Sequence, residues 1–171
     1  MAHVFDTARL RLRQLALDDA GFILELVTDP LWLRFIGDRG VHDVESARRY
    51  LESGPLEMYR SQGFGLWLVE RRADAAPIGI CGVLKRDSLD GPDLGFAFLP
   101  AYRGQGYARE AAAATLEHAR QRLGIQRVLA ITSPENLASA NVLRSVGMRF
   151  EQSIRLEGED RDTWLFVWPG P

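Results

Sequence analysis

The residues with the clearest potential for chemistry form a glycine-rich turn between a predicted strand and a predicted helix. The segment Arg103-Gly-Gln-Gly106-Tyr-Ala108 follows the alternating run 93–100 and precedes alanine and leucine residues at helical spacing. Its glycines leave backbone N–H groups uncovered at the positive end of the helix dipole. Such an arrangement binds anions, most often phosphate. The same pattern is also compatible with a strand-to-helix turn that binds nothing.

Two common nucleotide-binding turns fit this segment poorly. A Walker A loop requires Gly-Lys-Ser/Thr after its glycines, whereas this chain has Gly106-Tyr-Ala. A dinucleotide-binding turn requires glycine where Arg109 stands. It also requires a carboxylate at the end of the next strand, where Thr132 and Ser133 stand. The first interpretation is excluded and the second is disfavoured.

The elements that must position the turn are predicted from hydrophobic spacing. Leu10 and Leu12 are expected to face inward from the first strand, and Pro30 is expected to close the first helix. The aromatic segment 32–37 is expected to be an apolar connection. The predicted strands cover 9–15, 64–70, 78–84, 93–100, 127–131, 148–156 and 164–168, and the predicted helices cover 18–29, 43–60, 106–123 and 137–146.

This order predicts a mixed α+β fold in a single domain covering residues 1–171. We expect a central mixed, mostly antiparallel sheet of about seven strands, flanked by about four helices. Gly54-Pro55 must kink or break the second helix. Gly147 is expected to stop the last one in a left-handed conformation.

Composition limits the classes of partner. A net charge of −2 and a pI near 5.9 argue against nucleic acid. Cys81 is the only cysteine, which favours a reducing compartment. Residues 1–6 lack the pattern of a secretory signal, and no apolar stretch approaches the roughly 20 residues that span a bilayer. We therefore expect a cytoplasmic protein, monomeric or homodimeric, with no membrane partner.

Three segments together resemble the GNAT acetyltransferase superfamily. Arg103-Gly-Gln-Gly106-Tyr-Ala108 resembles its R/Q-x-x-G-x-G/A signature, and the run 93–100 resembles its fourth strand. Further along, 136–148 (Asn-Leu-Ala-Ser…Gly-Met) resembles the family's Asn-x-x-Ser/Ala…Gly-Phe/Met element. The order of elements matches along the whole chain. The most similar branch is the one that includes the ribosomal-protein N-terminal acetyltransferases.

The resemblance implies acetyl-CoA as cosubstrate and no metal. Successive amides from Gly104 to Ala108 would surround the pyrophosphate, and the strand edge would pair with the pantetheine arm and supply an oxyanion donor. Arg103 and Arg109 are either phosphate contacts or solvated arginines, and Asn136 is a helix cap that also contacts pantetheine. The expected cofactor-binding residues are Ala97, Phe98, Leu99, Arg103, Gly104, Gln105, Gly106, Tyr107, Ala108, Arg109 and Asn136.

The catalytic groups are less clear from the sequence. Many family members carry a tyrosine, the acid for the departing thiolate, where this chain has Leu143. Ser139 is therefore the substitute candidate for the acid. Asp93 and Glu135 are the nearest carboxylates for a base that takes the proton of the amine, although either can be a turn cap or a solvated charge.

The acceptor site is expected to involve two aromatic residues and an acidic turn. In the family, the segment containing Trp32 and Phe35 lines the acceptor pocket, but packing alone would also explain both. The family also places the closing hairpin beside the acceptor entrance. There Glu157, Glu159 and Asp160 would attract a cationic amine or form a solvated turn.

The resemblance implies that the protein is an enzyme that transfers the acetyl group of acetyl-CoA directly to a primary amine. A protein or peptide N-terminus is one possible acceptor. A small-molecule acceptor, such as a polyamine, amino sugar or drug, is the alternative within the same chemistry. A non-catalytic acyl-CoA sensor is the alternative outside it.

Overall fold

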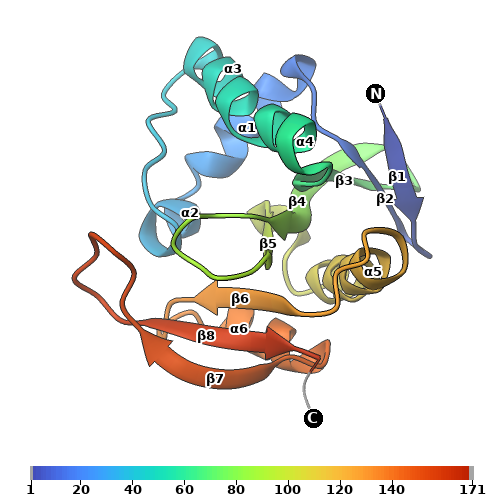
Figure 1. Cartoon of the computed structure of the whole chain (residues 1–171). Coiled ribbons are helices and arrows are strands. Elements are labelled where there is room, and N and C mark those ends of the chain that lie inside the picture. The colour runs from blue at the N-terminus through green and yellow to red at the C-terminus, as the bar shows by residue number, and fades with distance from the viewer. Residues whose placement is uncertain (1, 170–171) are drawn as a thin grey trace.

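A single mixed sheet runs through the protein, with helices on both of its faces (Figure 1). The computed structural model describes residues 2–169, so residues 1, 170 and 171 of the predicted domain lie outside the described part. The sheet has the order β1-β2-β3-β4-β5-β6-β8-β7, and all neighbours are antiparallel except β5 and β6. The strands are β1 (His3–Asp6), β2 (Leu10–Gln14), β3 (Leu66–Arg71), β4 (Ala76–Leu84), β5 (Asp93–Phe98), β6 (Val128–Thr132), β7 (Arg149–Ile154) and β8 (Thr163–Trp168).

The helices divide between the two faces and create a core on each. On one face, α5 and α6 bury Leu116 and Leu143 against the sheet; on the other, Ile23, Trp32 and Leu51 form a second core. None of the helices within residues 2–169 is long and apolar enough to cross a membrane. The α-helices are α1 (Ala20–Val27), α2 (Pro30–Phe35), α3 (Val44–Ser53), α4 (Pro55–Gln62), α5 (Tyr107–Arg122) and α6 (Leu137–Ser145).

The predicted mixed, mostly antiparallel α+β fold is confirmed, with one more strand than expected. The additional strand is β1, which pairs with β2 and packs Phe5 against the core. Its four residues carry too short a pattern to identify from spacing alone. The inward direction of Leu10 and Leu12, both 0% exposed, is as predicted. Gly147 adopts the expected left-handed conformation, with φ 93°.

The segment predicted to be an apolar connection is in fact the helix α2. Pro30, expected to end the first helix, instead opens α2, because its fixed φ and missing N–H suit the first helical position. Asp29 is the N-cap, and its carboxylate accepts hydrogen bonds from the amides of Leu31 and Trp32 at 3.2 and 3.4 Å. The dipeptide Asp29-Pro30 was therefore the start signal of a second helix.

The central strands approach each other closely at one glycine. A Cβ atom on Gly82 would lie 2.8 Å from the Cα of Leu66 and would also overlap the carbonyl oxygen of Gly65. Both obstacles are backbone atoms of the neighbouring strand, which cannot rotate away as a side chain could. The spacing between β3 and β4 therefore requires glycine at this position.

Gly82→Ala should lower the free energy of unfolding by about 1–3 kcal/mol, the usual cost of overpacking a core. Gly21→Ala is the matched control, because nothing lies within 4 Å of its Cβ position and it is in the helix α1. The control should raise stability by about 0.5–1 kcal/mol. Urea unfolding of the three proteins measures both effects; equal stability of Gly82→Ala and wild type would contradict the close approach.

Candidate active site

A crevice opens where the neighbouring parallel strands β5 and β6 separate. The two strands are in register only at Asp93 and Leu129, where the Leu129 amide donates to the Pro92 carbonyl at 2.9 Å. Within the described residues, β5 and β6 make no further ladder pair toward Phe98 and Thr132. The second half of β5 therefore has a free backbone edge in the middle of the sheet.

The hydrogen bonds to β4 determine which β5 amides face this crevice. The Leu99 amide donates to the Ile78 carbonyl at 2.9 Å, so it points toward β4. Amide direction alternates along a strand, and the Ala97 amide therefore also points toward β4. The amides of Phe96 and Phe98 point the other way, into the crevice. Of the three expected strand residues, Phe98 is the one whose amide is available, and Phe96 is an addition that the sequence pattern did not identify.

The glycine-rich turn directly follows β5 and opens α5. Gly104 and Gly106 have φ values of 74° and 84°, a left-handed conformation that favours glycine. In the described part of the chain, no backbone amide from Gly104 to Arg109 donates to a protein acceptor. These consecutive free amides at a helix N-terminus can bind a phosphate-sized anion.

Arg9 and Glu110 hold the turn in place from outside. The Arg9 guanidinium donates to the Gln105 carbonyl at 3.0 Å and to the Glu110 carboxylate at 2.7 Å. Glu110 also accepts from the Arg9 amide at 2.9 Å and the Thr7 hydroxyl at 2.5 Å. Because Arg9 lies about a hundred residues away in sequence, nothing in the turn itself signalled this contact.

Arg103 connects the turn to α2 on the other side of the crevice. Its guanidinium donates to the Phe98 carbonyl at 3.0 Å and to Asp29 Oδ2 at 2.7 Å. The Asp29 carboxylate, which also caps α2, is 7% exposed, whereas the Arg103 side chain is 35% exposed. The side chain of Arg103 is thus engaged with a carboxylate, and its part in binding phosphate stays a prediction.

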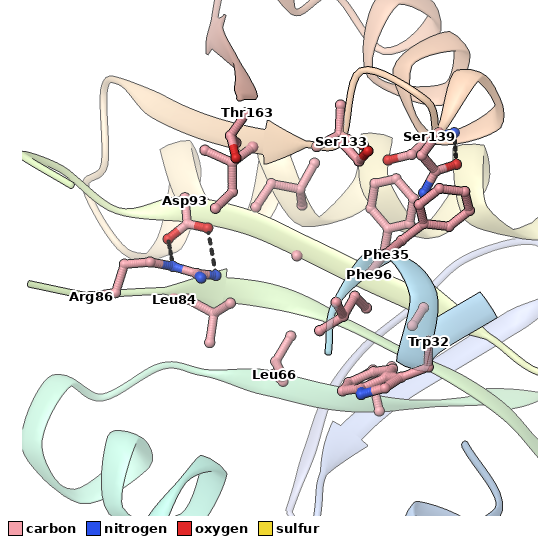
Figure 2. A pocket seen from close by; sticks show the side chains of 18 of the residues that line it. Trp32, Phe35, Leu66, Leu84, Arg86, Asp93, Phe96, Ser133, Ser139 and Thr163 are labelled. Atoms are coloured by element: carbon pink, nitrogen blue, oxygen red, sulfur yellow. Dashed lines mark hydrogen bonds and ion pairs between the residues drawn. The ribbon is translucent and has the colours of Figure 1, made fainter. Parts of the chain in front are cut away.

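A cavity of about 360 Å³ continues the crevice between β5, α2, α6 and the β7–β8 loop. Figure 2 shows Trp32 and Phe35 projecting into it from α2, opposite Ser139 on α6. The predicted site residues that line it are Trp32, Phe35, Asp93, Ala97, Asn136, Ser139 and Glu159. Phe98, Leu99 and the turn 103–109 lie outside it.

The start of α6 forms one wall of the cavity. The Asn136 side chain caps this helix by accepting from the Ser139 amide at 3.2 Å, as the sequence predicted. The Ser139 hydroxyl has no protein partner within residues 2–169 and lies on the cavity wall (Figure 2). Leu143, one turn further on, is 1% exposed and supplies no polar group.

Asp93 forms a bidentate ion pair with Arg86 at the other end of the cavity. Two guanidinium nitrogens donate to the two carboxylate oxygens at 3.0 and 3.1 Å (Figure 2). Burial raises the pKa of Asp93, and the Arg86 charge opposes that rise. Since both oxygens already accept hydrogen bonds, the catalytic role of Asp93 stays a prediction. Among the described residues, no group of three or more His, Cys, Asp or Glu side chains is placed to hold a metal ion.

Several cavity residues were not identified from the sequence. Most of them come from loops between the predicted elements, while Tyr50 lies in α3 and Thr163 begins β8, and only the fold brings them together. They are Arg39, Tyr50, Lys85, Arg86, Ser133, Arg161 and Thr163.

Comparison with known proteins identifies the class of this fold and site. The chain is 29% identical over 145 residues, 85% of its length and 82% of the relative's, to the uncharacterized N-acetyltransferase YnaD of Bacillus subtilis. An acetyltransferase of the GNAT family from Bacillus anthracis superposes with a TM-score of 0.79 at 25% identity, covering 96% of both chains. The ribosomal L7/L12 α-N-protein acetyltransferase RimL in complex with coenzyme A superposes with a TM-score of 0.72 at 15% identity, also covering 96% of both.

These similarities define an acetyl-CoA-dependent acyltransferase. Residues 9–149 match the acetyltransferase (GNAT) domain, and the chain therefore belongs to the GNAT family of N-acetyltransferases. The resemblance noted in the sequence is confirmed, including the structural likeness to a ribosomal-protein N-acetyltransferase.

The contact between Asp29 and Arg103 leads to a stability prediction. Asp29→Asn keeps a good N-cap but loses the ion pair, and it should lower the free energy of unfolding by about 1–2 kcal/mol, because the arginine is partly solvated. Asp29→Ala loses the cap as well and should cost about 1 kcal/mol more. Urea unfolding separates the two contributions. Identical stability of the two variants would show that the cap contributes nothing.

Proposed function

We propose that the protein acetylates a primary amine, at a peptide N-terminus or on a small molecule, by direct transfer from acetyl-CoA. The observation that carries this proposal is the free edge of β5 leading into the free amides of the α5 N-terminus. The chain thereby offers two groups of free backbone donors, one at the crevice edge of β5 and one at the start of α5. The donors at the crevice suit a thioester and an amide-containing arm, and the donors at the start of α5 suit a pyrophosphate.

In this proposal, the pyrophosphate of CoA binds at Gly104–Arg109 and the pantetheine arm lies along β5. The expected strand residues contribute unequally, because only the crevice-facing amides of Phe96 and Phe98 are free to bind the arm or polarise the thioester carbonyl. The Asn136 side chain faces the same cavity from α6 and contacts the arm from the opposite wall.

The transfer requires one bond to form and one to break. The amine nitrogen attacks the thioester carbon, the C–N bond forms, the C–S bond breaks, and the amine gives up a proton to solvent water, which returns one to the Ser139 side chain. Ser139 is proposed to donate a proton to the departing thiolate, because its hydroxyl lies on the cavity wall in the first turn of α6, where the helix dipole favours negative charge. Trp32 and Phe35 are proposed to enclose the acceptor.

Binding of CoA is tested by placing a negative charge in the turn. Gly104→Asp should weaken CoA affinity at least about tenfold, because a carboxylate repels the pyrophosphate. Gly124→Asp is the control, since Gly124 also has a positive φ (69°, against 74°) and an unobstructed Cβ position, but follows α5 at its other end. Calorimetric titration with CoA measures both. Equal loss of affinity in the two variants would remove the turn from the binding site.

The role of Ser139 is tested by removing its hydroxyl. Ser139→Ala should lower kcat at least about tenfold, with CoA affinity and melting temperature nearly unchanged, because the helix cap is the Asn136 side chain. Ser145→Ala removes a hydroxyl from the far end of the same helix and should leave kcat as it is. Normal turnover of Ser139→Ala would reject the proposed proton donor.

The sensor alternative is separated from the enzyme by product formation. A catalyst releases free CoA thiol in the presence of amines faster than in their absence, whereas a sensor binds acetyl-CoA without releasing it. We also propose a cytoplasmic location, which would keep the buried thiol of Cys81 reduced.

A further inference from the structure

The acceptor end of the cavity is lined by an excess of positive charge. Four cationic side chains line the cavity, against two carboxylates. One of those carboxylates, Asp93, is 1% exposed and already neutralised by Arg86. The cations are Arg39, Lys85, Arg86 and Arg161, and the carboxylates are Asp93 and Glu159.

The excess does not reflect the composition of the surrounding loops, which together carry more acids than bases. In the loop after α2, Arg39 lines the cavity and its neighbour Asp38 does not. In the β7–β8 loop, Arg161 lines it and both flanking residues, Asp160 and Asp162, do not. The same loops thus direct bases toward the cavity and most acids away from it.

The β4–β5 loop repeats this division of charge. Lys85 and Arg86 line the cavity, whereas Asp87 and Asp90 do not. The Lys85 ammonium donates to the carbonyls of Arg86 and Leu89 at 3.3 and 3.5 Å and has no carboxylate partner within residues 2–169. Three loops, distant in sequence, therefore contribute like charge to the lining of one cavity.

Besides Lys85, two more of these cations, Arg39 and Arg161, lack a counterion within the described residues. Within the described residues, neither Arg39 nor Arg161 takes part in an ion pair; Arg161 donates only to the Arg34 carbonyl, at 3.4 Å. The phenol of Tyr50 lies within electrostatic reach of Arg39 and Arg86, since both lower its pKa against the rise caused by burial. Guanidinium groups beside a phenol offer hydrogen-bond donors suited to a carboxylate or phosphate.

We propose that the acceptor is a primary amine that also carries an anionic group, a carboxylate or a phosphate, which the Arg39 and Arg161 side of the cavity recognises. The inference rests on the proposed function of N-acetyl transfer. Figure 2 shows the Arg86–Asp93 pair well apart from Ser139. Among the described residues, Glu159 is the one carboxylate that lines the cavity without an ion pair, and it is available for the ammonium form of the incoming amine. A polyamine has no anionic group that could pair with the two arginines.

The test uses acceptor pairs that differ in one charge. The tripeptide amides Ser-Glu-Ala and Ser-Gln-Ala share the same N-terminal amine, and γ-aminobutyrate with γ-aminobutyramide forms the small-molecule pair. The anionic member of at least one pair should be acetylated with a kcat/KM about tenfold higher than that of its neutral partner, mainly through a lower KM. A charge-assisted hydrogen bond changes affinity by about this tenfold factor. A preference within the tripeptide pair indicates a peptide acceptor, and a preference within the γ-aminobutyrate pair indicates a free metabolite.

Substitution of the two unpaired arginines should remove the preference. In Arg39→Gln/Arg161→Gln, the ratio of kcat/KM between anionic and neutral members should fall to near unity, with CoA affinity unchanged. Arg48→Gln is the matched control, because Arg48 is an exposed arginine on α3 that does not line the cavity. The control should keep the wild-type ratio, and about 0.5 M salt should reduce that ratio in the wild type.

The outcomes separate the inference from the proposed function. Equal acetylation of neutral and anionic members, a preference for cationic amines, or an equal effect of Arg48→Gln would overturn the anionic acceptor while leaving acetyl transfer intact. If CoA stabilises the protein but no amine of either pair, nor a polyamine, increases release of the thiol, the proposed function fails and the inference fails with it.

Discussion

The separation of β5 from β6 is the constraint on which the rest of the structure depends. After the single pair at Asp93 and Leu129, the ladder stops, and interior backbone groups are left for a ligand to satisfy. Because α5 begins just beyond the end of β5 and α6 just beyond the end of β6, the same separation places two helix N-termini beside the opening. One interruption in a sheet thus provides an edge, a phosphate-sized anion site and a wall for the reaction.

The two halves of the site use different physical means. The turn and the free edge of β5 present backbone amides, whose directions are set by φ angles and strand register rather than by side chains. The cavity presents side chains from α2 and three loops, whose charges and shapes can be exchanged without altering the sheet. Asp29 joins the halves, because one carboxylate both caps the helix that carries Trp32 and holds Arg103. A shift of α2 would therefore be felt at the turn.

Most of the fold, the left-handed glycines of the turn and the Asn136 cap could be predicted from the sequence because their determinants are local. Glycines just before one helix and an asparagine just before a second helix directly indicate the backbone conformation at which each helix starts. The acceptor half could not be predicted in the same way. Arg39, Arg86 and Arg161 are each separated from the next by more than 40 residues in the sequence. They line the same cavity only because the chain folds into this sheet. The helix α2 is hidden in the sequence for a different reason, because Pro30 fits the end of one helix as well as the start of the next, and Asp29 as N-cap makes it a start.

A binding surface made of main chain has a consequence for how the protein can diverge. Most substitutions leave a peptide N–H where it was, so the turn from Gly104 to Arg109 offers few targets for mutational loss apart from its two left-handed glycines. Drift can replace most of the sequence while the fold persists, in keeping with a TM-score of 0.72 at 15% identity. The loops that carry the cavity arginines are under no such geometric restriction. A few amino-acid substitutions in these loops would therefore change the acceptor preference without altering the fold.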